Sequence, residues 1–214
     1  MKTKLFYRLL LTVLCGIFTT QVNAQEVGDT FTANNGIEYQ ITFITDRGAS
    51  KVKAIDYSGT STSVDIPLIV SDDGNSYNVT AIGDEAFKQT HNEGPLTSVT
   101  IGNAVTSIGN RAFQDNNFTS VDIPNSVISI GDYAFSYNNI TSLTIGSGVT
   151  SIGERAFTSN DITSLTIPNS VTSIGRYAFV GNDLTEVISL SENPATITSN
   201  VFDDDSLLVT QLKT

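Results

Sequence analysis

The chain repeats one motif, Ile-Gly-x-x-Ala-Phe, at a nearly fixed spacing. Five copies are intact and a sixth is degraded, and they begin at Ile82, Ile108, Ile130, Ile152, Ile174 and Ile197. The closing phenylalanines of successive copies lie 26, 22, 22, 22 and 23 residues apart. A fixed period of about 22 residues is typical of a protein that stacks equivalent coils, rather than of a globular domain built around one pocket. The repeat therefore favours an extended binding or structural surface over an enzyme.

One repeat unit holds two short apolar segments separated by a turn. In the unit at residues 162–182, Leu165 and Ile167 alternate with hydroxylated residues, which is the pattern of a half-buried strand. A proline ends this strand because it cannot donate to a ladder. Val171 and Ile174 supply the second apolar pair. A single coil leaves its two faces uncovered, so its stability must come from stacking. We predict a mainly β solenoid of about six 22-residue coils.

An asparagine recurs three residues after the phenylalanine in four units. The four residues are Asn116, Asn138, Asn160 and Asn182. In a stack of coils, such a column can act as a structural ladder whose amide groups bond the backbones of neighbouring coils. Ordinary turn asparagines are the alternative. Neither interpretation gives these residues a ligand.

The two x positions of the motif vary most between units. The second of them reads, along the stack, Glu85, Arg111, Tyr133, Arg155 and Tyr177. Neighbouring coils should lie about 4.8 Å apart, so arginine and tyrosine would alternate within contact range. Two interpretations remain open. The side chains could stack between coils as cation–π pairs, or they could form a binding stripe, since Arg and Tyr are frequent at interface hot spots. The candidate ligand contacts are Arg111, Tyr133, Arg155 and Tyr177, with Tyr137 beside them.

A second exposed surface, the outward face of the strands, carries mainly hydroxyl groups. It is nearly uniform along the chain, and serine and threonine are ordinary residues for an exposed strand. We therefore expect it to contribute less specificity than the x positions. Its residues are Ser98, Thr100, Ser120, Asp122, Ser142, Thr144, Ser164, Thr166 and Glu186.

The unit as a whole resembles the BspA-type bacterial leucine-rich repeat. The resemblance rests on Leu/Ile-Thr-Ser-Leu/Val-x-Ile-Pro followed by Val-Thr-Ser-Ile-Gly-x-x-Ala-Phe, and it runs from about Val64 to Phe202. Members of that family typically have 23-residue repeats with a cysteine where this chain has the recurring asparagine. The resemblance implies a curved, leucine-rich-repeat-like solenoid, export to the cell surface, and adhesion to host proteins or other cells. It implies no catalytic residues.

The first 24 residues read as a secretory signal peptide. A basic start with Lys2, Lys4 and Arg8 precedes an apolar run at residues 9–18, and Val-Asn-Ala at residues 22–24 resembles a cleavage site. An uncleaved membrane anchor is the alternative, but the apolar run is too short to span a bilayer comfortably. We therefore expect an exported, extracellular or cell-surface protein with no membrane span after cleavage.

The remaining chain divides at changes of pattern. Residues 25–60 are predicted to form an N-terminal β cap, because residues 37–43 alternate between apolar and polar and a second strand is expected near residues 52–57 after a turn at 46–48. Residues 61–202 form the solenoid, and residues 203–214 a C-terminal cap or tail. Between Pro67 and Val79 the first coil carries nine extra residues, which predict a protruding hairpin with a tight turn near residues 72–75.

The composition of the chain argues against several classes of function. The chain has 22 acidic and 11 basic residues, and removal of the signal peptide would change the net charge from −11 to −14. This balance argues against binding nucleic acid or an anionic membrane through bulk charge. His91 is the single histidine, and Cys15, the single cysteine, lies in the signal peptide. We expect neither catalysis nor a cofactor or metal. The favoured partner is a protein or glycan on host or neighbouring cells, and the alternative is a non-binding spacer of the cell envelope.

Overall fold

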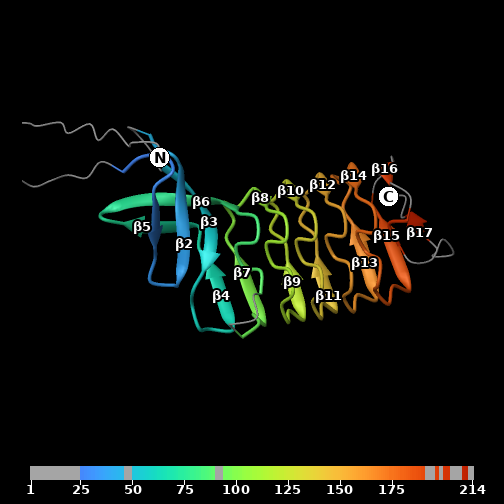
Figure 1. Ribbon diagram of the computed structural model, residues 1–214. Coiled ribbons are helices and arrows are strands. Elements are labelled where there is room, and N and C mark those ends of the chain that lie inside the picture. The colour runs from blue at the N-terminus through green and yellow to red at the C-terminus, as the bar shows by residue number, and fades with distance from the viewer. Residues whose placement is uncertain are drawn as a thin grey trace, which may run out of the picture.

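The computed structural model describes residues 25–45, 50–89, 94–190, 196–197, 200–202 and 209–211. The expected signal peptide, the turn at residues 46–48, His91 and most of the C-terminal segment lie outside these residues. The described chain consists of strands and turns, and its coils follow one another along a single axis (Figure 1). The predicted strand-rich repeat architecture is confirmed. In this part of the chain, no helix is long and apolar enough to cross a membrane.

A small sheet lies at the N-terminal end of the stack. It contains β1 (Thr30–Thr32), β2 (Ile37–Phe43) and β3 (Ser50–Tyr57), which pair antiparallel in that order. Ile37, Tyr39 and Ile41 point inward and are buried, as the alternating sequence predicts. Strand β3 then pairs in parallel with β6 (Asn75–Ile82). The N-terminal sheet therefore continues directly into the first coil.

The predicted hairpin is present between residues 69 and 82. Strand β5 (Ile69–Asp72) pairs antiparallel with β6, and Asp73 and Gly74 form the turn with φ values of 44° and 79°. Positive φ at both central residues is the requirement of a type I′ turn, whose twist matches that of the strands. The hairpin projects at the N-terminal end of the molecule (Figure 1).

Two lines of parallel strands run the length of the repeats. The first continues from β6 through five two-residue strands: β8 (Ser107–Ile108), β10 (Ser129–Ile130), β12 (Ser151–Ile152), β14 (Ser173–Ile174) and β16 (Thr196–Ile197). The second comprises β4 (Ser63–Ile66) with β7 (Ser98–Ile101), β9 (Ser120–Asp122) with β11 (Ser142–Thr144), and β13 (Ser164–Ile167) with β15 (Glu186–Ser189) and β17 (Val209–Gln211). Equivalent residues pair, so each residue type forms a column.

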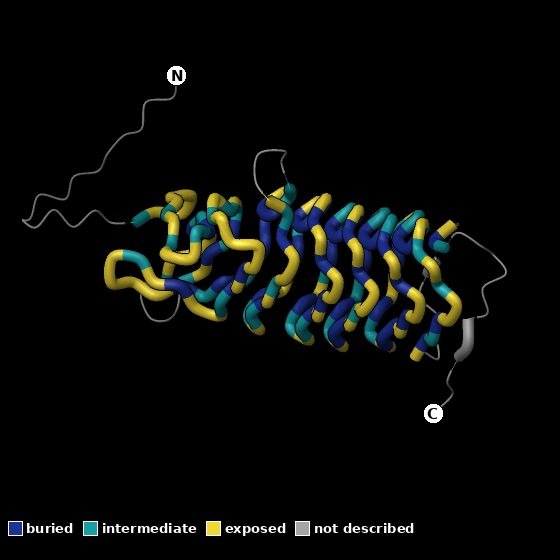
Figure 2. The backbone as a smooth tube through the Cα atoms, turned by 90° about the horizontal axis from the view of Figure 1, so that it is seen from below, coloured by how far each residue is buried: buried dark blue, intermediate teal, exposed yellow. Residues whose placement is uncertain are grey.

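A column of aromatic rings fills the interior. The closing phenylalanines stack coil on coil, with centroid separations between 5.0 and 5.9 Å from Phe87 to Phe202. Phe113, Phe135 and Phe157 are fully buried. Buried segments recur at equivalent places in successive coils (Figure 2). Offset stacking and burial of apolar area therefore provide the attraction between coils.

The motif glycine permits this close stacking. A Cβ atom on Gly153 would lie 2.5 Å from the carbonyl carbon of Gly131 and 2.6 Å from the backbone nitrogen of Asp132. Because both are backbone atoms of the preceding coil, a methyl group could fit only if the coils separated. We expect Gly153→Ala to lower the free energy of unfolding by about 1–3 kcal/mol, measured by denaturant titration. Gly94→Ala is the matched control, since nothing lies within 4 Å of its Cβ position. Equal midpoints for the two variants would contradict the close-packing explanation.

Candidate ligand-binding surface

The second x position of the motif adopts left-handed backbone geometry in every described copy. The φ values are 58° at Glu85, 54° at Arg111, 58° at Tyr133, 52° at Arg155 and 59° at Tyr177. We call these five residues the left-handed column. This region of φ is unfavourable for residues other than glycine and asparagine, and the degraded last copy has Asn200 there, with φ of 65°.

Hydrogen bonds between coils hold each bend in place. The Arg111 N–H donates to the carbonyl oxygen of Asp132 at 2.8 Å, and the Tyr133 N–H donates to that of Glu154 at 2.8 Å. Equivalent bonds recur along the stack. The left-handed geometry is therefore set by the backbone of the next coil, whatever side chain the position carries.

The side chains of the column contact one another in sequence. The Arg111 guanidinium carbon lies 5.4 Å from the Tyr133 ring centroid, and that of Arg155 lies 5.5 Å from Tyr133 and 4.8 Å from Tyr177. At the start of the column, Arg111 Nη1 is 3.4 Å from Glu85 Oε1. The structure thus brings together four of the five residues predicted from the sequence as ligand contacts, and it also shows cation–π pairing between the coils.

This packing determines which groups face the solvent. Tyr133 belongs to a coil between those of Arg111 and Arg155. The Arg111 guanidinium carbon lies near its ring, and Arg155 Nη1 donates a hydrogen bond to its hydroxyl. The side chains of Arg111 and Arg155 keep 48% and 37% of their surface exposed. The column therefore presents the edges of its rings and guanidinium groups, which carry hydroxyl and N–H donors.

The far end of the column is electropositive. Arg176, at the first x position of its coil, has its guanidinium carbon 5.0 Å from the Tyr177 ring, and its Nη2 donates to the Tyr177 hydroxyl at 3.0 Å. The pKa of Tyr177 is lowered, first by a hydrogen bond with the Asn200 side chain, and then by the hydrogen bond and the charge of Arg176. Arg155 contributes a smaller effect of the same sign. Negative charge is thus favoured at this place.

Tyr137 lies outside the column and is more isolated. It also has a left-handed backbone, with φ of 55°, and it is 51% exposed. Its side chain has neither a hydrogen-bond partner nor a ring partner among the described residues. Asp115 occupies the equivalent position in the preceding coil, and Ser159 and Gly181 occupy it in the next two coils. None of these neighbours is aromatic, so the phenol ring does not stack between coils.

The recurring asparagines bond to backbones of two coils. Asn138 Oδ1 accepts from the Phe118 N–H at 3.2 Å, and Asn138 Nδ2 donates to the carbonyl oxygens of Phe113 at 3.0 Å and Phe135 at 3.1 Å. Asn116, Asn160 and Asn182 make equivalent bonds. Asn116, Asn138 and Asn160 are buried. In these coils the amide groups satisfy interior backbone atoms and are not exposed to a ligand.

A second polar column, at the first x position, was not predicted from the sequence. At the first x position, Asp84 Oδ1 accepts from the Asn110 N–H at 2.8 Å, Asn110 Oδ1 accepts from the Asp132 N–H at 2.8 Å, and Asp132 Oδ1 accepts from the Glu154 N–H at 2.7 Å. The signal in the sequence was an Asp or Asn at this position in three consecutive copies. These three side chains support the bends of the stack by accepting backbone N–H groups of the next coil. In the described residues, no group of three or more acidic, histidine or cysteine side chains could hold a metal ion.

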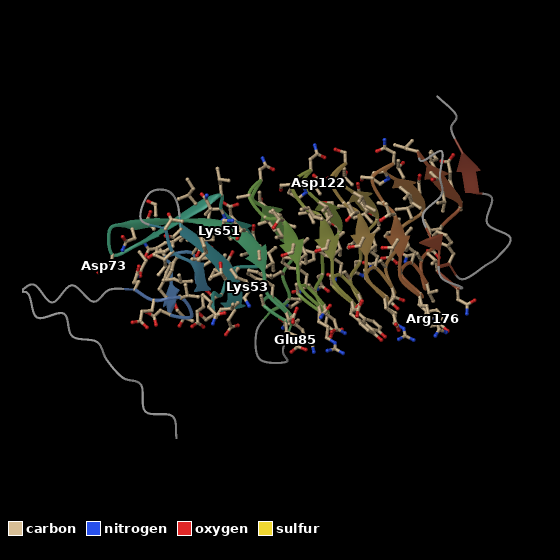
Figure 3. The ribbon with its side chains drawn as sticks, turned by 90° about the horizontal axis from the view of Figure 1, so that it is seen from above. Lys51, Lys53, Asp73, Glu85, Asp122 and Arg176 are labelled. Carbon is tan, nitrogen blue, oxygen red and sulfur yellow. The ribbon has the colours of Figure 1, made fainter. Side chains whose placement is uncertain are left out.

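The hydroxyl-rich strand face lies on the other side of the coils. Asp122, which belongs to this face, projects from the side opposite Glu85 and Arg176 (Figure 3). Some of its hydroxyl groups bond within the protein, as Ser98 Oγ does to Ser63 Oγ at 2.9 Å. The face is exposed and regular, and it offers few charged or aromatic groups.

Parallel coils, stacked phenylalanines and in-register columns together define a β-rich repeat protein. The BspA type leucine rich repeat region matches this chain over residues 80–209, in six copies. The match covers more than half of the 214 residues. The chain belongs to this family, as the sequence motif predicted. No protein with a curated description matches it.

Several solved structures share the fold. The pneumococcal vaccine antigen PcpA aligns with a TM-score of 0.58 and 20% identity, over 77% of this chain and 51% of that one. A leucine-rich repeat protein from Bacteroides ovatus gives 0.55 and 25%, over 73% and 49%. The T. pallidum leucine-rich repeat protein gives 0.55 and 22%, over 70% and 68%. The chain spans about half the length of the first two.

Proposed function

We propose that the chain is an exported repeat module that binds a protein or glycan ligand on host or neighbouring cells through the left-handed column and Tyr137. It is a capped, non-enzymatic solenoid of about six coils. The signal-peptide pattern of the first 24 residues supports export, and membership of a repeat family supports an extended surface rather than a catalytic pocket.

One observation carries the binding proposal: arginine and tyrosine occupy positions where asparagine would be less strained. Left-handed geometry costs about 1–2 kcal/mol per residue for ordinary side chains. An exposed cation–π pair returns about 0.5–1 kcal/mol. Stacking between coils therefore does not offset the cost, and Asn200 fills the same position in the last copy without such a pair. Large, half-exposed Arg and Tyr side chains are favoured at interface hot spots, which gives a reason for their presence here.

The test replaces the four candidate contacts with the residue that suits their backbone. The variant carries Arg111→Asn, Tyr133→Asn, Arg155→Asn and Tyr177→Asn. Wild type and variant, both beginning at Gln25, are compared by interferometry against matrix proteins, glycans and whole cells. We expect saturable wild-type binding that weakens at least tenfold in the variant. We also expect the melting temperature to change by only a few degrees, because asparagine relieves strain as the pairs are lost.

A second quadruple variant controls for general loss of surface polarity. It replaces Thr100, Asp122, Thr144 and Thr166 with alanine on the opposite, hydroxyl-rich face, and it should bind as the wild type does. Loss of binding in this variant instead would assign the ligand to the strand face. A folded wild type that binds nothing in the panel would favour the spacer function, which is supported by the near-uniform hydroxyl columns.

A further inference from the structure

Positive charge in the repeats is confined to one edge. Between residues 94 and 202 the sequence has three basic residues, Arg111, Arg155 and Arg176, and eight acidic ones. All three arginines belong to the two x positions, on the edge from which Glu85 and Arg176 project (Figure 3). The same positions also carry Asp132 and Glu154, so the excess of positive charge lies at the end of the edge that holds Arg155 and Arg176. A carboxylate ligand is attracted to that end.

Two of these arginines converge on one tyrosine. The guanidinium carbons of Arg155 and Arg176 lie 4.8 and 5.0 Å from the Tyr177 ring centroid. Arg155 Nη1 pairs with Glu154 Oε1 at 2.9 Å, whereas Arg176 makes no ion pair with any described residue. The pKa of Tyr177 is lowered first by the Asn200 hydrogen bond and then by the hydrogen bond and charge of Arg176. This end of the column therefore has one uncompensated cation that a ligand carboxylate can neutralise.

Arg111 and Arg155 can each bind a second carboxylate. A guanidinium has five N–H donors in a planar fork. Arg111 uses one nitrogen for Glu85, and its side chain is still 48% exposed. Stacking on Tyr133 holds the Arg111 fork in a fixed orientation, so less side-chain entropy is lost when a carboxylate binds. The N–H donors at the edge of this fixed guanidinium plane are well placed to bond to a carboxylate.

The guanidinium groups beside the rings favour a peptide over a neutral sugar. Aromatic side chains bind neutral sugar rings mainly by presenting a face, whereas this column places Arg111 5.4 Å from the Tyr133 centroid and Arg155 4.8 Å from the Tyr177 centroid, so that charged N–H donors lie beside each ring. Spacing supports a peptide. Arg111 and Arg155 are two coils apart, about 9.6 Å at a spacing of about 4.8 Å. In a polyproline II segment, which is also extended, every third side chain lies on the same face, about 9.3 Å apart at about 3.1 Å per residue. Carboxylates at every third residue of such a peptide therefore match Arg111 and Arg155.

We propose that the left-handed column and Arg176 bind an extended acidic peptide segment whose carboxylates recur at every third residue. The proposal rests on the binding function proposed above and names its ligand class. One carboxylate pairs with Arg111, the next pairs with both Arg155 and the neighbouring guanidinium of Arg176, and Tyr137 packs against the peptide beside them.

The test uses defined probes. A synthetic peptide with glutamate at every third residue is titrated against the protein beginning at Gln25, together with its glutamine counterpart and with hyaluronate as an acidic glycan. We expect the glutamate peptide to bind at least tenfold more tightly than the other two. We also expect its dissociation constant to rise with ionic strength. The Arg155→Asn/Arg176→Gln variant should lose at least tenfold in affinity.

The matched control removes the same charge elsewhere. Lys51→Gln/Lys53→Gln takes two positive charges from the N-terminal sheet and should bind the glutamate peptide as the wild type does. Arg176→Gln alone is a second test that leaves every left-handed position intact. Equal binding of the glutamate and glutamine peptides, or preferential binding of hyaluronate, would overturn the acidic-peptide assignment. A ligand from the cell and matrix panel could bind the wild type, fail to bind the quadruple asparagine variant, and bind with an affinity that neither Arg176→Gln nor salt changes. In that case the proposed binding function stands and the acidic-peptide assignment fails.

Discussion

Asn138→Ala is expected to lower the free energy of unfolding by about 3–5 kcal/mol. The substitution leaves the Phe118 N–H and the carbonyl oxygens of Phe113 and Phe135 without their amide partner. Asn138 is buried, so water does not replace these bonds freely. Each buried polar group left unsatisfied costs about 1–3 kcal/mol. Because the three groups belong to two neighbouring coils, the loss affects the stack rather than one turn.

Equilibrium denaturation in urea measures this effect, with Asn139→Ala as the matched control. Asn139 is the next residue along the chain, but it is exposed, and its side chain makes no hydrogen bond with the described residues. We expect the control to differ from wild type by less than about 0.5 kcal/mol. A loss of less than 1 kcal/mol in the Asn138 variant would show that its buried bonds contribute little to the stack.

Phe135→Ala is expected to cost about 3–5 kcal/mol. Its ring is fully buried and lies 5.0 Å from the Phe113 ring and 5.4 Å from the Phe157 ring. Truncation removes apolar burial and leaves a cavity between two neighbouring coils. Since each coil contacts chiefly its neighbours, a cavity in the middle of the column should also weaken the coupling between its two ends.

The comparison variant is Tyr137→Asn, two residues further along the same coil. This ring is half exposed, and asparagine suits the left-handed backbone at this position. We expect its denaturation midpoint to match that of wild type. The Phe135 variant should melt earlier and with a broader transition. A sharp transition at the wild-type midpoint for Phe135→Ala would contradict the role assigned to the ring column.

Much of the fold follows from the repeat alone. Period and apolar pattern predicted the stacked coils, the strand at residues 37–43 and the hairpin near residues 72–75, because each has a local signature. The two-residue strands such as Ser129–Ile130 were not predicted. Two residues show no periodicity, and their pairing is created only when the next coil supplies a partner. The parallel pairing of β3 with β6, which joins the N-terminal sheet to the first coil, also depends on tertiary contacts.

The surface was predictable in its composition but less so in its geometry. Stacking in register predicts from the sequence that Arg111, Tyr133 and Arg155 lie in one line. The left-handed backbone beneath them was not predicted, since Arg and Tyr rarely adopt it, and Asn200 was the one residue in the column that indicated it. The orientation of each tyrosine ring in the column depends on the position of the guanidinium group packed beside it. A sequence alone therefore leaves open whether ring faces or ring edges meet the solvent.

The central claim is that the left-handed column binds a ligand and is dispensable for folding. The most direct measurement is the dissociation constant of the wild type and of the quadruple asparagine variant for the tightest ligand in the cell and matrix panel. We predict at least a tenfold difference between two proteins whose circular dichroism spectra coincide. Equal dissociation constants for two equally folded proteins would contradict the claim and remove these residues from the binding surface.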